Sequence, residues 1–281
     1  MSLDEIITGL IYLIAVFIVF LAGKVAYNLL NKQFDLNRQL VKEDNFAVAL
    51  TIVGYYLGLL FAIGGILYGP SNGLLEDVID IFFWGIMAII LLNISGKLND
   101  KIILSTFDNT KEIIDDKNAG TGAVEGANYL AVGLIVSGAL SGEGGDIFTG
   151  LVFWFLGQAT LILAEKAYNF ITPFDIHAEI EKDNVAVGVA FAGVLIAIGN
   201  LIRVGIAGDF VSWQENISDF LVVIIFGLVL LPVVRYATDK ILLPGENLTD
   251  ELVNQEKPNV GAGLIEAFSY VAASFLLGWV L

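Results

Sequence analysis

The chain has 281 residues, of which 57% are hydrophobic and 16% are charged, and its mean hydropathy is +0.79. This composition is too apolar for a soluble domain and indicates a polytopic protein whose main partner is the lipid bilayer. The net charge of −16 argues against a nucleic-acid partner, and the absence of cysteine excludes disulfides and cysteine-ligated metals.

Eight segments are apolar over the roughly 20 residues that a membrane-spanning helix needs. They cover residues 6–28, 45–68, 76–97, 120–141, 147–169, 184–206, 217–238 and 260–281. The first segment is not expected to be a signal peptide, because the residues before it are acidic and its counterpart lies in mid-chain. We therefore predict an all-α integral membrane protein with eight transmembrane helices.

The sequence repeats itself, so that residues 1–142 recur as residues 143–281. Matching stretches include Thr8-Gly9-Leu10 with Thr149-Gly150-Leu151, Ala26-Tyr27-Asn28 with Ala167-Tyr168-Asn169, Phe34-Asp35 with Phe174-Asp175, and Asp100-Lys101-Ile102 with Asp239-Lys240-Ile241. Each copy holds an even number of spans, so both copies have the same orientation. We expect two parallel four-helix repeats, related by a pseudo-twofold axis along the membrane normal and packed through segments 120–141 and 260–281.

The basic residues predict the orientation in the membrane. Thirteen of the fourteen Lys and Arg residues lie at or between span ends on one side, and Arg203 is left for the other. By the positive-inside rule the first side is cytoplasmic, which places both termini on the non-cytoplasmic side.

Glu125 and Glu266 are the acidic residues that most need an explanation, because each lies about five residues inside a predicted span. At 1.5 Å per residue this is roughly 7 to 8 Å from the cytoplasmic end. An ionisable residue inside a span is costly and indicates an ion pathway or proton relay, but it can also hydrogen-bond neighbouring helices together. We treat the two residues as a candidate intramembrane titratable pair.

Other recurring polar and small residues have structural and functional interpretations. One set lies before apolar runs or in the preceding loops, where it suits helix caps or a shared cytoplasmic mouth: Asp44, Asn45, Asp183, Asn184, Asp35 and Asp175. A second set suits close helix packing, with a hinge or pore lining as the alternative: Gly120, Gly122, Gly261 and Gly263. The single histidine, His177, aligns with Asn37 of the first copy, so a duplicated metal or proton site cannot depend on it, and it is expected to be a solvated loop residue.

No enzymatic site is predicted. The chain lacks the histidines of a triad, the thiol of a cysteine nucleophile and a glycine pattern that would bind a nucleotide. We therefore predict no catalytic residue, no cofactor and no metal site.

The order of motifs in each copy resembles a known family. These motifs are the Ala-Tyr-Asn end of the first span, the Phe-Asp loop, the Asp-Asn-x-Ala-Val start of the second span, and Asn-x-Gly-x-Gly-x-x-Glu before the fourth. The chain resembles two tandem copies of the bacterial inner-membrane family catalogued as domain of unknown function 350. The resemblance implies a multi-pass protein of the bacterial cytoplasmic membrane and supplies no agreed activity, substrate or catalytic residue.

Two functions remain open at the level of sequence. The protein could move protons, a cation or a small solute along the interface between the repeats, with Glu125 and Glu266 as paired sites. Alternatively, it could be a non-transporting scaffold that docks partners in an envelope or membrane-stress assembly. The sequence allows a homo-oligomer and a cytoplasmic protein partner in either case.

Overall fold

The computed structural model describes residues 2–69, 71–243 and 245–280, and these are helical with no strand among them. The long helices are α1 (Leu3–Leu30), α3 (Phe46–Tyr68), α4 (Leu74–Leu98), α6 (Ala119–Ala139), α7 (Ile147–Ile171), α9 (Val185–Ile206), α10 (Trp213–Ala237) and α11 (Val260–Val280). Three short helices and three π-helical turns connect them: α2 (Leu36–Val41), η1 (Asn99–Ile103), α5 (Asn109–Ile114), α8 (Ile176–Glu181), η2 (Thr238–Leu242) and η3 (Asp250–Asn254).

Seven of the long helices in the described part of the chain are long and apolar enough to cross a membrane. The helix that falls short is α6, which occupies the segment where a further span is expected. Its surroundings explain its lower apolarity, because small residues such as Gly122, Gly126 and Gly133 are buried against neighbouring helices. A helix enclosed by protein does not need the large aliphatic side chains of a lipid-facing helix.

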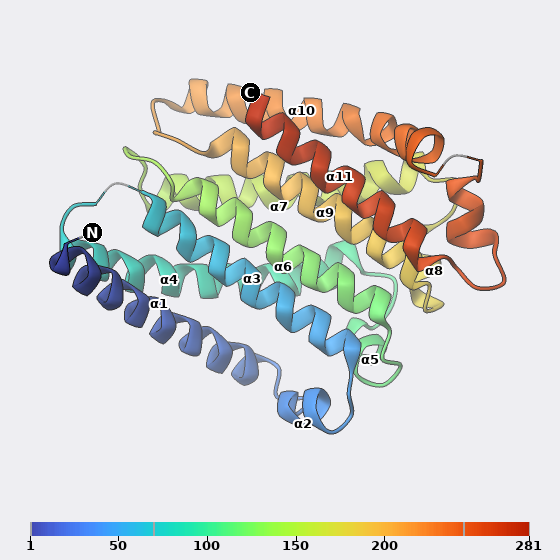
Figure 1. Cartoon of the computed structure of the whole chain (residues 1–281), viewed down its shortest axis with the longest axis horizontal. Coiled ribbons are helices and arrows are strands. Elements are labelled where there is room, and N and C mark those ends of the chain that lie inside the picture. The colour runs from blue at the N-terminus through green and yellow to red at the C-terminus, as the bar shows by residue number, and fades with distance from the viewer. Residues whose placement is uncertain (1, 70, 244, 281) are drawn as a thin grey trace.

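Four of the long helices form a row in the middle of the molecule, in the order α3, α6, α9 and α11 (Figure 1). Helix α6 packs extensively on both α3 and α9, and α9 packs on both α6 and α11. Helices α4 and α7 pack against α6 from behind, while α1 and α10 flank the two ends of the row. The prediction that segments 120–141 and 260–281 pack against each other is therefore wrong, since α9 lies between them.

Small residues on two faces of α9 explain this arrangement. Gly188 faces the backbone of Gly120 in α6, and Gly193 faces Ala267 in α11, so closely that an added Cβ would collide with either neighbour. Helices approach this closely in a membrane when the contact residues are small, because van der Waals packing and not exclusion of water drives their association. Helix α9 can therefore be enclosed from both sides, and most of its residues are buried.

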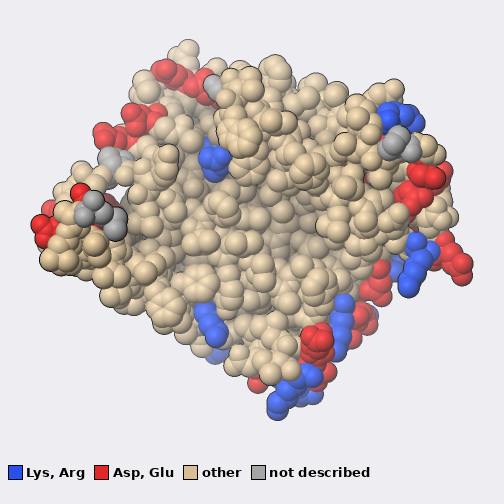
Figure 2. Space-filling model, in the orientation of Figure 1, with Lys and Arg blue, Asp and Glu red and all other residues tan. Residues whose placement is uncertain are grey.

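Charged residues separate into two zones at the ends of the bundle. Figure 2 shows a broad uncharged band between them on the face in view. Apolar side chains along α1 and α10, such as Leu13, Phe17 and Ile225, are exposed, as expected of helices that contact lipid. Lys and Arg gather at the end that carries α2, α5 and α8, which we call the basic end. The opposite end is dominated by Asp and Glu.

Candidate functional site

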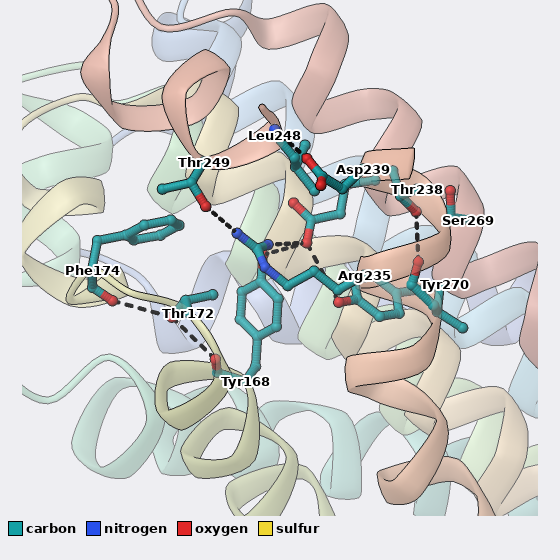
Figure 3. A network of polar contacts seen from close by, with 12 residues as sticks. Tyr168, Thr172, Phe174, Arg235, Thr238, Asp239, Leu248, Thr249, Ser269 and Tyr270 are labelled. Carbon is teal, nitrogen blue, oxygen red and sulfur yellow. Dashed lines mark hydrogen bonds and ion pairs between the residues drawn. The ribbon is translucent and has the colours of Figure 1, made fainter. Parts of the chain in front are cut away.

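The second repeat contains a buried ion pair between Arg235 of α10 and Glu266 of α11 (Figure 3). The side chain of Glu266 is fully buried, and its Oε1 also accepts hydrogen bonds from the hydroxyls of Tyr168 at 3.1 Å and Tyr270 at 3.4 Å. A carboxylate removed from solvent needs such compensation, because an unpaired buried charge is costly. Glu266 is thus neutralised within the protein.

The guanidinium of Arg235 is enclosed on several sides. It donates a hydrogen bond to Thr249 Oγ1 at 3.2 Å and lies 6.0 Å from the ring centre of Tyr168 and 5.8 Å from that of Phe174. Cations are attracted to aromatic faces at such distances. Two side chains of α11 complete the enclosure of this guanidinium. The five side chains around it, which we call the Arg235 receptor, are Glu266, Tyr168, Tyr270, Phe174 and Thr249.

Sequence reasoning missed Arg235, which was counted only among the residues that mark the cytoplasmic side. The available signal was its position inside the predicted span 217–238, where a basic residue requires a partner as much as an acidic residue does. The sequence did not show which acid it meets, because Arg235 and Glu266 are 31 residues apart and lie on different helices.

Glu125 of α6 lies in a different environment in the first repeat. It lines a cavity of about 140 Å³ with Asp100, and the two carboxylates are near enough to interact electrostatically. Within the described residues, neither carboxylate has a Lys, Arg or His nitrogen within 4.0 Å. Two adjacent ionised carboxylates repel each other, so such a pair favours a shared proton or a bound cation.

The two predicted intramembrane acids are therefore not brought together. Glu125 and Glu266 belong to separate sites, each enclosed by helices of its own repeat, and neither lies in the glycine-lined contact between α6 and α9. The cavity volume is on the order of ten times what one water molecule requires, so the Glu125 site can hold several waters or a small ligand.

The polar residues that recur before the second span of each repeat act as helix caps. Asn45 and Asn184 accept hydrogen bonds from the first turns of α3 and α9, each at 3.2 Å, and Asp35 and Asp175 cap α2 and α8 in the same way. A separate pair does not cap: Asp44 and Asp183 precede the caps with positive φ angles of 47° and 61°. Short polar side chains tolerate this left-handed conformation better than most residues.

The four glycines predicted to pack helices have unequal neighbours. An added Cβ at Gly122 would collide with Ala47 of α3, and one at Gly263 would collide with Ala186 of α9, so these equivalent positions permit equivalent close contacts. Gly120 faces the start of α9, whereas Gly261 meets only the side chain of its own cap residue, Asn259. The difference arises because α6 has a neighbour on that side and α11 ends the row.

His177 is not the solvated loop residue that the sequence predicts. It lies on α8 with 13% of its side chain exposed, and its Nε2 is 2.7 Å from the carbonyl oxygen of Ile103 and 3.5 Å from Glu165. Glu165 is a further buried acid, located in α7, that the sequence analysis did not single out. His177 therefore connects the second repeat to the end of η1 in the first.

The fold and these sites define a multi-pass helical membrane protein built from a duplicated unit. The family described as Domain of Unknown Function (DUF350) matches residues 1–140 and again residues 144–281, so the chain belongs to this family as two tandem copies. The chain is also 23% identical over 270 residues to a UPF0719 transmembrane protein of Aquifex aeolicus (strain VF5), an alignment that covers 94% of this chain and 97% of the relative. No solved structure matches the chain.

Proposed function

We propose that the protein binds a small cation or a proton at Glu125 and moves it across the bacterial cytoplasmic membrane. The observation that carries this proposal is the contrast between the two acids. Glu266 already has an internal cation in Arg235, whereas Glu125 and Asp100 face a cavity and form no ion pair with a basic side chain among the described residues. A site that keeps negative charge without neutralising it internally is suited to an exchangeable positive ligand.

The membrane arrangement in this proposal has eight spans, with α6 as the span that neighbouring helices enclose. The basic end is cytoplasmic by the positive-inside rule, and both termini lie outside. The Glu125 cavity is lined by residues that follow α1 and precede α6, including Phe34 and Thr110, so it belongs to this basic end. The ligand then enters from the cytoplasm.

The route proposed here runs within the first repeat and not along the contact between the repeats. Helices α6 and α9 meet through Gly120 and Gly188 and, further along, through Ala131 and Gly199, at distances that leave no room for a Cβ at Gly188 or Gly199. The cavity lies between α6 and the helices of its own repeat, on a different side of α6. These contacts support one site in one repeat as the working unit.

A flux measurement tests this function. The purified protein is reconstituted in liposomes, and the uptake of H⁺, Na⁺, K⁺ and guanidinium is compared with that of empty liposomes. Transport through the proposed site predicts that Glu125→Gln lowers the flux about tenfold or more, because a charge-assisted contact is lost. The matched control Glu181→Gln removes an exposed carboxylate at the same end and is expected to leave the flux unchanged. Equal flux in both variants would contradict the proposal.

The orientation is tested separately by thiol labelling. Because the chain contains no cysteine, an introduced cysteine is the single thiol that can react. Asn37→Cys at the basic end should react with a membrane-impermeant reagent only from the cytoplasm. Ser71→Cys at the opposite end should react only from outside, since both positions are exposed. The reverse labelling pattern would invert the topology.

The scaffold function is the second candidate, and a repeated set of contacts at the basic end favours it. The side-chain amides of Asn45, Asn118 and Asn184 donate to the carbonyls of Ile113, Ile180 and Leu252 at 2.8, 2.6 and 2.9 Å, respectively. Each of these buried bonds joins the start of a long helix to the next connecting segment at the basic end, so the connecting segments are held in place and can dock a protein partner. Absence of flux for all four cations would favour this function.

A further inference from the structure

The residue equivalent to Arg235 in the first repeat is Gly96. Both residues lie four positions before the recurring Asp-Lys-Ile stretch, at Asp239 and Asp100, and the preceding Leu-Leu pairs also align without a gap. The second repeat therefore carries a guanidinium at a point where the first has no side chain.

The Arg235 receptor has a complete counterpart in the first repeat. Its five members, Glu266, Tyr168, Tyr270, Phe174 and Thr249, align with Glu125, Tyr27, Tyr129, Phe34 and Thr110, and the residue type is the same at every position. All five counterparts line the cavity of about 140 Å³, and so does Gly96. The first repeat thus retains the side chains that hold a guanidinium and lacks the guanidinium itself.

The detailed packing shows why this cavity is not simply an unfilled arginine site. An added Cβ at Gly96 would collide with the hydroxyl of Tyr129, so this tyrosine takes the place of the arginine stem. Tyr270, the equivalent residue in the second repeat, instead directs its hydroxyl to Glu266 at 3.4 Å. The space beside Glu125 remains open while the position of the stem is closed, which suits a free ligand and excludes a tethered side chain.

The charge of the cavity also differs from that of its counterpart. Asp239 accepts the backbone N–H of Leu248 and pairs with Lys240, each at 2.7 Å, whereas Asp100 accepts the side-chain amide of Asn109 at 2.9 Å and has no basic partner among the described residues. Lys97 is the basic residue in the cavity lining, and it is exposed and makes no ion pair within the described parts of the chain. Among the described residues, both carboxylates of the cavity therefore lack an ion pair, whereas both of their equivalents in the second repeat have one.

We propose that the first-repeat cavity is a binding site for a free guanidinium-type cation, held by the residues that correspond to the Arg235 receptor. A planar guanidinium can form charge-assisted hydrogen bonds to Glu125 and Thr110 while its faces contact Tyr27 and Phe34. Alkali ions and ammonium are more strongly hydrated and lack the flat surface that aromatic rings contact. This inference deepens the proposed cation function and rests on it for its relevance to transport.

Binding of radiolabelled guanidinium chloride to the full-length protein in detergent tests the inference, with NaCl, KCl and NH4Cl as competitors. We expect saturable binding that equal concentrations of the three competitors do not displace. Glu125→Gln should weaken the affinity about tenfold or more, and Glu181→Gln should leave it unchanged. No saturable binding, or equal affinity in both variants, would overturn the inference.

The second repeat provides an independent check that does not depend on the fold of a Glu125 variant. Arg235→Ala removes the internal guanidinium from the same set of side chains, so it should create a second guanidinium site and double the number bound per chain. Added guanidinium at low millimolar concentration should also raise the thermal stability of this variant, while NaCl should not. If the variant gains a site and the unmodified protein shows none, the first-repeat assignment is wrong.

The outcomes also separate this inference from the proposed function. Binding of K⁺ or NH4⁺ that outcompetes guanidinium and depends on Glu125 would overturn the guanidinium assignment and leave the cation site in place. Guanidinium binding without flux of any tested cation would support the ligand assignment and refute transport.

Discussion

Arg235 is expected to stabilise the protein through Glu266, and this can be measured. Replacing Arg235 by Met keeps much of its apolar volume but leaves Glu266 fully buried with only two tyrosine hydroxyls as partners. Its second oxygen, Oε2, has no hydrogen-bond partner among the described residues even in the intact site. Breaking a buried ion pair from one side costs about 3–5 kcal/mol, and we expect Arg235→Met to fall in this range.

The matched control is Arg203→Met at the opposite end of the bundle. Arg203 is half-buried and hydrogen-bonds Asn200 at 3.0 Å, and among the described residues it has no carboxylate partner. Its replacement removes one hydrogen bond, which contributes about 1 kcal/mol. The free energy of unfolding is measured for both variants in mixed micelles by tryptophan fluorescence.

The double variant Arg235→Met with Glu266→Met completes the test. Replacing both members of a buried ion pair by apolar residues is often nearly neutral, so the double variant should be more stable than Arg235→Met alone. If Arg235→Met costs no more than Arg203→Met, or if the double variant loses the sum of the single effects, the pair does not couple as described.

Two further predictions concern packing and charge. Gly54→Ala should destabilise the protein by about 1–3 kcal/mol, because the added Cβ would collide with the backbone of Gly126 and push α3 away from α6. Gly9 has open space around it, so Gly9→Ala should be neutral or slightly stabilising in the same unfolding assay. Arg38 hydrogen-bonds Glu43 at 3.1 Å and holds the pKa of this exposed carboxyl below its usual value, so the contribution is present at neutral pH and is lost as the pH falls through the lowered pKa. Unfolding measured from neutral to acidic pH should show a smaller pH dependence in Arg38→Ala, and an unchanged dependence would refute this assignment.

Much of the fold follows from local sequence patterns. Runs of apolar residues predict where the long helices lie, and Asn before such a run predicts a cap, as Asn45 and Asn184 illustrate. These features depend on neighbours along the chain, so the residue types alone determine them to within a few positions.

The choice of neighbouring helices could not be read from the same patterns. Several helices carry small residues of similar spacing. That Gly188 of α9 packs on α6, and Gly193 on α11, is known only from the structure. The candidate site depends on the same information. Glu125 and Glu266 look equivalent in sequence, and the difference between them comes from a residue on another helix, Arg235 in one repeat and Gly96 in the other.

The row of four helices also has a consequence for assembly. Its central contact joins unlike elements, the last helix of one repeat and the second helix of the next, so it is a head-to-tail interface that could in principle be continued by further copies. At the two outer faces of the row, where a further copy would have to pack, large side chains stand at positions where the inner contacts have glycine. Gly138, which packs on Arg203, corresponds to Trp279 at the free face of α11, and Gly199, which packs on Ala131, corresponds to the exposed Leu60 of α3. The bulky side chains at the two outer faces of the row thus oppose its extension by a further copy of the chain.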